Sequence, residues 1–124
     1  MSASSDTRPL ADSLRPRGPF HLELSEEDKG GATLLRPRGE VDVVTAPKLA
    51  ARLDAILRGR KGDVIIDLSD TEFLDSAGLH ALLVAQRRLA RRSRGLRVIC
   101  EPGPVRHVIE LARLAETLGL SPPE

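Results

Sequence analysis

The sequence is poor in aromatic and sulfur-containing residues. Its 124 residues include no Trp, no Tyr, one Cys and two Phe. The single cysteine, Cys100, cannot form a disulfide within the chain, so we expect a fold without one and a reducing, cytoplasmic environment. The lack of aromatic rings argues against a single-strand nucleic-acid binder, because such proteins stack bases on aromatic side chains.

Long apolar runs are also missing. No stretch approaches the roughly 20 apolar residues that a membrane-spanning helix needs, and no secretory-signal core is present, so we expect neither insertion nor export. The net charge of +1, from 19 basic and 18 acidic residues, gives no general attraction to nucleic acid or to membranes. The charges are unevenly placed, since residues 87–97 hold six arginines and no acid, whereas residues 63–75 hold five acids and no base.

The length and composition predict one small folded domain. Hydrophobic residues make up 40% of the chain and charged residues 30%, which is typical of a globular protein. Residues 1–19 show no apolar period and are predicted to be a flexible tail. We expect the domain to span residues 20–120, followed by a short tail at 121–124.

Four strands are predicted. Alternating polarity indicates a strand over Phe20–Leu24, and a second over Ala32–Arg36, joined as a hairpin by a polar turn at residues 26–31. The β-branched run Val64–Leu68 predicts a strand buried on both faces, as in parallel sheets covered by helices. Leu96–Cys100 predicts the fourth strand, with Cys100 buried in it.

Three helices are predicted between and after these strands. Thr45 can cap a helix that begins at Ala46, and a second helix covers Ala77–Arg92. A third helix follows Pro104, and Leu114–Leu120 predicts a short terminal turn or helix. The expected inward residues are Ala46, Leu49, Ala50, Leu53, Ile56 and Leu57, then Leu79, Leu82, Leu83, Leu89 and Ala90, then Val105, Val108, Ile109 and Ala112. The order predicts an α/β fold with a four-stranded, mostly parallel sheet, an N-terminal hairpin and helices packed mainly on one side.

The loop predicted at residues 70–75 leads into the second helix at Ser76. Functional groups gather beyond the carboxyl ends of strands in open α/β sheets. The start of a helix also carries unpaired N–H groups that favour an anion, so a phosphate on Ser76 would be tolerated locally. Asp42, after the second strand, can lie beside it. The alternative from these residues is that Ser76 only caps the helix and Gly78 only allows close packing.

Two motifs give the chain a family resemblance. The segment Phe73–Leu79, FLDSAGL, resembles the phosphorylation loop of the STAS domain of bacterial anti-sigma factor antagonists. Gly39–Asp42, followed by Thr45 and Ala46, resembles that family's second motif. The strands at 64–68 and 96–100 match its remaining strands in order, and the resemblance covers residues 20–120.

The resemblance implies a STAS-like fold and a binding switch without catalytic residues, cofactor or metal. Such proteins bind an anti-sigma factor, often a serine kinase of the histidine-kinase-like ATPase fold, and so release a sigma factor. The kinase phosphorylates the serine after the aspartate, here Ser76, and a serine phosphatase reverses this. Ala77 departs from the family, which often has a second Ser or Thr there. The implied phosphosite environment and partner-binding residues are Asp42, Thr45, Asp75, Ala77, Gly78 and Leu79.

Other functions fit the sequence less well. Leu74–Gly78 partly resembles the G-x-S-x-G elbow of hydrolases, but Leu74 replaces the first glycine, and His21, His80 and His107 lack a triad context. Calcium-loop and nucleotide-binding motifs are absent. The remaining alternatives are a STAS-like accessory subunit that binds an ABC transporter ATPase, or a component of another stress-signalling assembly. The arginines of 87–97 are expected to form a solvated face, with docking of an acidic partner as the lesser possibility.

Overall fold

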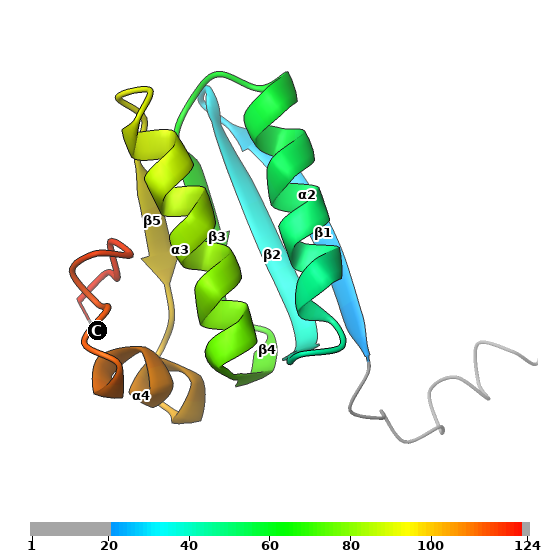
Figure 1. The fold of residues 1–124 in the computed structure, drawn as a ribbon, viewed down its shortest axis with the longest axis vertical. Helices are drawn as coiled ribbons and strands as arrows, with labels where there is room; N and C mark the ends of the chain where they lie inside the picture. The colour runs from blue at the N-terminus through cyan, green and yellow to red at the C-terminus, as the bar shows by residue number, and fades with distance from the viewer. Residues whose placement is uncertain (1–20, 123–124) are drawn as a thin grey trace, which may run out of the picture.

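The computed structural model describes residues 21–122 of the chain. Its elements follow the predicted order of a hairpin and then alternating helices and strands, except that one additional strand precedes the second helix (Figure 1). The predicted tail at 1–19, together with Phe20 and residues 123–124, lies outside the described residues. Each described helix is too short or too polar to cross a bilayer.

The hairpin is longer than the sequence predicts. β1 (Leu22–Lys29) pairs antiparallel with β2 (Ala32–Val41), and only Gly30 and Gly31, with φ of +62° and +94°, form the turn. The turn expected at 26–31 is therefore wrong for residues 26–29, which belong to β1. An edge strand tolerates this polar sequence because most of β1 is exposed to solvent.

Two helices cover one face of the sheet. α2 (Ala46–Gly59) and α3 (Ser76–Ala90) run side by side across it in Figure 1. Their apolar stripes form the core with the strand residues that face them, such as Leu35, Val64, Ile66 and Val98. Ala50 and Ala90, predicted to point inward, are exposed. Ala50 lines an open groove between α2 and α3, and Ala90 is the last residue of α3.

The sheet has five strands instead of four. β3 (Val64–Asp67) lies between β2 and β5 (Leu96–Ile99) and pairs parallel with both, so it is an interior strand of the sheet. Residues predicted as a loop contain a further strand, β4 (Thr71–Leu74), parallel to the second half of β2. Because β2 has ten residues and β3 only four, the far end of β2 offers free backbone groups that β4 satisfies. Ile65 and Asp67 are only half-buried, so β3 is not fully covered on its second face.

The C-terminal part closes the end of the sheet near β4. α4 (Pro104–Leu111) buries Val105 and Ile109, whereas Ala112, predicted to be inward, is exposed just beyond the helix. Arg106 on α4 is only 6% exposed and donates hydrogen bonds to the carbonyl oxygens of Cys100 (2.6 Å) and Ser121 (2.9 Å). The segment before Ser121 is tied to β5 as well, since the Ser121 N–H donates to Val98. These hydrogen bonds link Ser121 to both α4 and β5.

Candidate functional site

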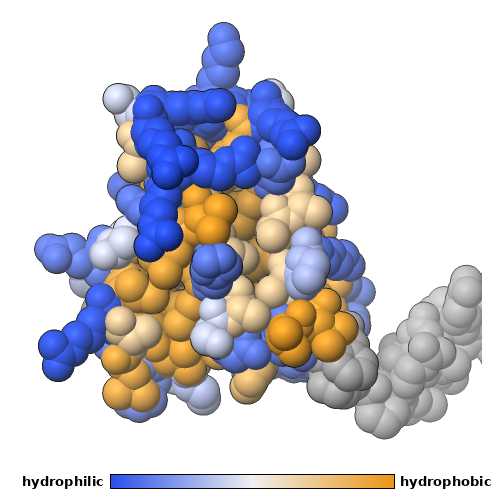
Figure 2. All heavy atoms as spheres, in the orientation of Figure 1, coloured by the Kyte–Doolittle hydropathy of each residue, from blue (hydrophilic) through white to orange (hydrophobic). Residues whose placement is uncertain are grey.

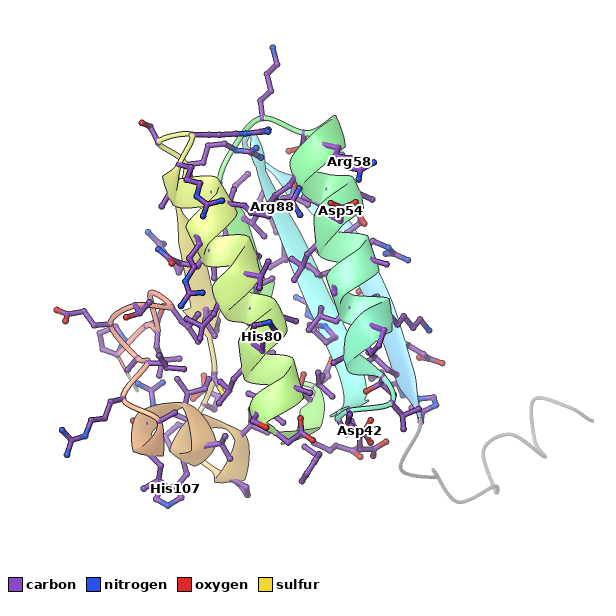
Figure 3. The ribbon with its side chains drawn as sticks, viewed as in Figure 1. Asp42, Asp54, Arg58, His80, Arg88 and His107 are labelled. Carbon is purple, nitrogen blue, oxygen red and sulfur yellow. The ribbon has the colours of Figure 1, made fainter. Side chains whose placement is uncertain are left out.

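Two loops meet at the end of the sheet where α3 begins. β2 and β4 pair there through Val41 and Leu74, and the N–H of Asp75 donates to the carbonyl oxygen of Val41 over 3.2 Å. Asp42 follows Val41 directly, so the loop after β2 and the start of α3 lie next to one another. Figure 3 shows Asp42 at this end of the molecule.

Asp75, and not Ser76, caps α3. Its carboxylate accepts hydrogen bonds from the N–H groups of Ala77 (2.9 Å) and Gly78 (3.3 Å), as an N-cap residue does. Ser76 is the first residue of the helix and is exposed. Within residues 21–122 its hydroxyl has no hydrogen-bond partner. The cap role considered for Ser76 is therefore filled by its neighbour, which leaves the hydroxyl facing solvent.

Asp42 and Thr45 build the adjoining loop. The Asp42 carboxylate accepts hydrogen bonds from the N–H groups of Val44 and Thr45, each at 2.9 Å. The Thr45 hydroxyl donates to the carbonyl oxygen of Glu40 (2.7 Å) and accepts from the Asp42 N–H. Thr45 occupies the N-cap position of α2, but its side chain makes no capping hydrogen bond because its hydroxyl is used in this loop.

The predicted site residues differ in exposure. Thr45, Gly78 and Leu79 are buried, whereas Asp42, Asp75 and Ala77 are half-buried. A β-carbon added at Gly78 would lie 2.7 Å from Val41 Cγ1 and 2.5 Å from Leu74 Cδ1. Such contacts are far inside van der Waals distance. These residues therefore position the start of α3, and of the whole set only Ser76 is openly presented to solvent.

Three exposed apolar side chains lie on the two segments that meet at this end of the sheet, and the sequence analysis did not identify them. Val43 is 73% exposed, Val44 is 53% exposed and Phe73 is 48% exposed. Val43 and Val44 lie in the Asp42 loop, and Phe73 lies three residues before Ser76. The sequence did hold a signal for this surface: Val43 and Val44 are adjacent, and neither a strand period nor a helix period accounts for both.

An apolar groove of about 400 Å³ continues from this patch between α2 and α3. Figure 2 shows it as a pale to orange band between the two helices, with hydrophilic residues at the upper end. Val43 and Ala77 line its lower end, and His80 and Val84 lie further along it. The remaining lining residues are Ala46, Pro47, Ala50, Leu53, Ala81, Ala85 and Arg88.

Asp67, the last residue of β3, carries a charge that Arg36 compensates. Asp67 Oδ2 accepts hydrogen bonds from both Nε and Nη2 of Arg36 at 3.2 Å, while Oδ1 accepts from the hydroxyl and N–H of Ser69. Partial burial raises the pKa of Asp67, but the Ser69 and Arg36 hydrogen bonds and the Arg36 charge outweigh it, so the pKa lies below its ordinary value. Asp70 and Glu72 remain exposed.

The other candidate groups do not come together. His21 precedes β1, His80 lies on α3 and His107 lies on α4. Within residues 21–122 no hydrogen bond joins any of them to Ser76, and no cluster of His, Cys, Asp and Glu suited to a metal is found. Cys100 is a free, buried thiol directly after β5, and its burial raises its pKa.

Comparison with known proteins gives consistent matches. The STAS domain family model matches residues 24–123. The anti-sigma-F factor antagonist RsfB of Mycobacterium tuberculosis is 28% identical over 102 residues, covering 82% of this chain and 83% of RsfB.

Solved structures show the same fold. The crystal structure of an anti-sigma factor antagonist from Mycobacterium paratuberculosis aligns with a TM-score of 0.79 at 32% identity, covering 85% of this chain and 89% of that one. The phosphorylated form of Bacillus SpoIIAA shares the fold with a TM-score of 0.59 at 21% identity, covering 82% and 92% of the two chains. A family-model match across most of the chain, on a five-stranded α/β fold of this kind, establishes that the chain belongs to the STAS domain family.

Proposed function

We propose that this chain is an anti-sigma factor antagonist that binds an anti-sigma factor and so releases a sigma factor. The similar proteins from the two mycobacteria carry that name. The observation that carries the proposal is the presentation of Ser76, an exposed hydroxyl at the first residue of α3, beside the exposed apolar side chains of Val43, Val44 and Phe73. Because sigma factors act on transcription, the proposal places the chain in the cytoplasm.

In this proposal the apolar side chains supply the binding energy. Burial of each of these three partly exposed side chains in an interface contributes about 1–2 kcal/mol to the binding free energy. The rigid Asp42–Thr45 loop and the Asp75 cap hold these side chains in position before binding, so little ordering is needed when the partner arrives. The role is one of binding and not of catalysis.

Phosphorylation of Ser76 ends binding in the proposed switch. A phosphate adds about −1.5 to −2 charge at an exposed position one residue from the Asp75 carboxylate. That carboxylate already accepts the N–H groups of Ala77 and Gly78, so the helix start has fewer free donors to compensate the phosphate. Repulsion and desolvation of about 3–4 kcal/mol would weaken binding by two to three decades.

The partner is expected to be a serine kinase of the histidine-kinase-like ATPase fold, with a serine phosphatase as its opponent. The test is incubation of the chain with the candidate kinase and ATP, mass spectrometry to locate the phosphate, and a binding titration of both forms. Ser76→Ala should abolish phosphorylation and keep binding, while Ser76→Glu should weaken binding. Ser25→Ala, at an exposed serine on β1, is the matched control. Phosphate on another residue, or unchanged affinity after phosphorylation of Ser76, would contradict the proposal.

A second measurement tests the apolar contact surface separately. Val43→Ser should weaken binding of the anti-sigma factor by at least about tenfold, as loss of a buried interface anchor does. Leu111→Ser is the control, because Leu111 at the end of α4 is 69% exposed, comparable to Val43 at 73%. Equal affinities of the two variants would argue against an interface at Val43. Binding to an ABC transporter ATPase, with none to an anti-sigma factor, would favour the accessory-subunit alternative.

A further inference from the structure

The apolar groove between α2 and α3 is bordered by exposed side chains. It measures about 400 Å³, and Val43 and Val84, which line it, are 73% and 37% exposed. Along α3 its lining residues run from Ala77 to Arg88, a length of about 16 Å. An exposed apolar groove between two helices fits the apolar face of a short helical segment.

The described residues begin beside the lower end of this groove. The N–H of Glu40 donates to the carbonyl oxygen of His21 (2.9 Å), and Lys48 Nζ on the first turn of α2 donates to that of Leu22 (2.6 Å). Val43, which lines the groove, follows Glu40 by three residues. Figure 1 shows the start of β1 at the same end of the molecule as the starts of α2 and α3. The residues that precede His21 therefore join the domain next to the groove.

The 20 residues before His21 include a short apolar cluster. Leu10, Ala11 and Leu14 stand in a segment that is otherwise rich in Ser, Asp, Arg and Pro. Three residues are too few to establish a period, but their spacing of i, i+1 and i+4 places them on one face of a helical turn. This spacing is that of the anchor residues by which a helix packs into an apolar groove.

The linker between this cluster and the domain is long enough to reach the groove. Leu14 precedes His21 by seven residues, which span up to about 23 Å when extended, and Pro16 and Pro19 within them favour extended backbone. α2 with its side chains is about 10 Å across, so the linker can pass around its first turn. Tethering keeps the local concentration of the cluster near about 1 mM, which favours it over an untethered competitor.

The charges at the lower end of the groove fit this segment. Arg15 and Arg17 follow Leu14 closely, so they reach the lower end when Leu14 occupies it. Asp42 and Asp75 are half-buried there. Both carboxylates accept hydrogen bonds from backbone N–H groups, which leave their negative charge in place. Two cations beside two anions favour docking in this direction.

The upper end of the groove carries the opposite charge. Arg88 Nη1 lies 2.8 Å from Asp54 Oδ1, but Asp54 Oδ2 also pairs with Arg58 Nε at 3.1 Å, so one carboxylate serves two guanidinium groups (Figure 3). Asp6 precedes the apolar cluster and lies toward Arg88 when the segment runs up the groove. The reverse direction would bring the basic residues of the segment to this basic end.

We propose that residues 6–17 of this chain dock in the groove between α2 and α3, with Leu10 and Leu14 buried in it. This differs from the flexible tail that the polar composition predicts. The docked segment covers Val43, so it competes for one of the apolar side chains around Ser76. Docking depends on the groove, the linker and the charges, and it does not rest on the proposed function.

The first test is methyl NMR spectroscopy of the full chain. We expect nuclear Overhauser contacts from the methyl groups of Leu10 and Leu14 to those of Ala81 and Val84. A sample that mixes isotope-labelled and unlabelled chains separates contacts within one chain from contacts between two. Contacts found only between chains would assign the groove to a second copy, and the absence of contacts would leave it to another partner. Either result overturns the proposal.

A matched pair of variants is the second test. Leu10→Ser/Leu14→Ser should shift the methyl resonances of Ala81 and Val84, because their apolar neighbours are lost. Ser4→Ala/Ser5→Ala changes two residues of the same tail at constant charge and should leave these resonances in place. Resonances that stay in place in the leucine variant, or that move equally in the control, overturn the proposal. Neither test involves Ser76 or an anti-sigma factor, so a failure here is separate from a failure of the proposed function.

Discussion

Gly78 on α3 faces Val41 at the end of β2 with no room for a methyl group between them, since a β-carbon there would approach Val41 Cγ1 to 2.7 Å. Gly78→Ala is therefore expected to lower the free energy of unfolding by about 1–3 kcal/mol, as overpacking of a core does. Urea unfolding measures this. Gly59→Ala at the end of α2 is the control, because a β-carbon there meets no atom within 4 Å, and its free energy of unfolding should stay the same or rise by up to about 1 kcal/mol.

The capping of α3 gives a second prediction. Asp75→Ala should destabilise the chain by about 1 kcal/mol, because it removes the acceptor of two N–H groups. Ser76→Ala should change the free energy of unfolding by less than about 0.5 kcal/mol, since the Ser76 side chain is exposed and unbonded within the described residues. Thermal unfolding of both variants is the measurement. A larger loss for Ser76→Ala would show that the hydroxyl, and not the carboxylate, caps the helix.

Asp67 predicts a pH dependence of stability. Its folded-state pKa lies below the unfolded value of about 3.9, so its ionised form favours folding. This contribution is fully present above about pH 3.9 and is lost as the pH falls through the lower folded-state pKa. Asp67→Asn should therefore cost about 1–3 kcal/mol near neutral pH, and the difference from wild type should shrink in acid.

Urea unfolding of wild type and Asp67→Asn at neutral and acidic pH measures this difference. Glu27→Gln is the control, because Glu27 and Lys29 form an ion pair at 3.7 Å with both side chains more than half exposed. That pair should contribute less than about 1 kcal/mol at either pH. A difference for Asp67→Asn that stays constant with pH would mean that the carboxylate charge is not what stabilises the fold.

Arg106 predicts that one side chain holds the C-terminal segment. Arg106→Met should destabilise the chain by about 2–4 kcal/mol, because it leaves the carbonyl oxygens of Cys100 and Ser121 without their charged donor. The Ser121 amide, which donates to Val98, should lose protection from hydrogen exchange. Arg113→Met, at an exposed arginine, should leave both quantities unchanged. Retained protection of Ser121 in Arg106→Met would contradict this role.

Local patterns were sufficient to predict the elements whose signal is periodic. The β-branched run at 64–67 forms the central strand β3, and the stripes of α2 and α3 face the core as expected apart from Ala50 and Ala90. These signals are local because a side chain's face in a helix or strand depends on its spacing along the chain. The motif around Ser76 could also be read from the sequence, because it is a run of consecutive residues.

Long-range contacts decided the rest. β4 forms because the second half of β2 has free backbone groups, and Arg106 is buried because Cys100 and Ser121 come together around it. Both Asp and Ser are favourable N-cap residues, so the sequence allowed either Asp75 or Ser76 to cap α3. The backbone geometry decided which side-chain oxygen reaches the free N–H groups. Residue order thus determined the elements and the motif of this protein. Only the folded arrangement decided which residue caps α3 and which arginine is buried, because both depend on the three-dimensional placement of hydrogen-bonding groups.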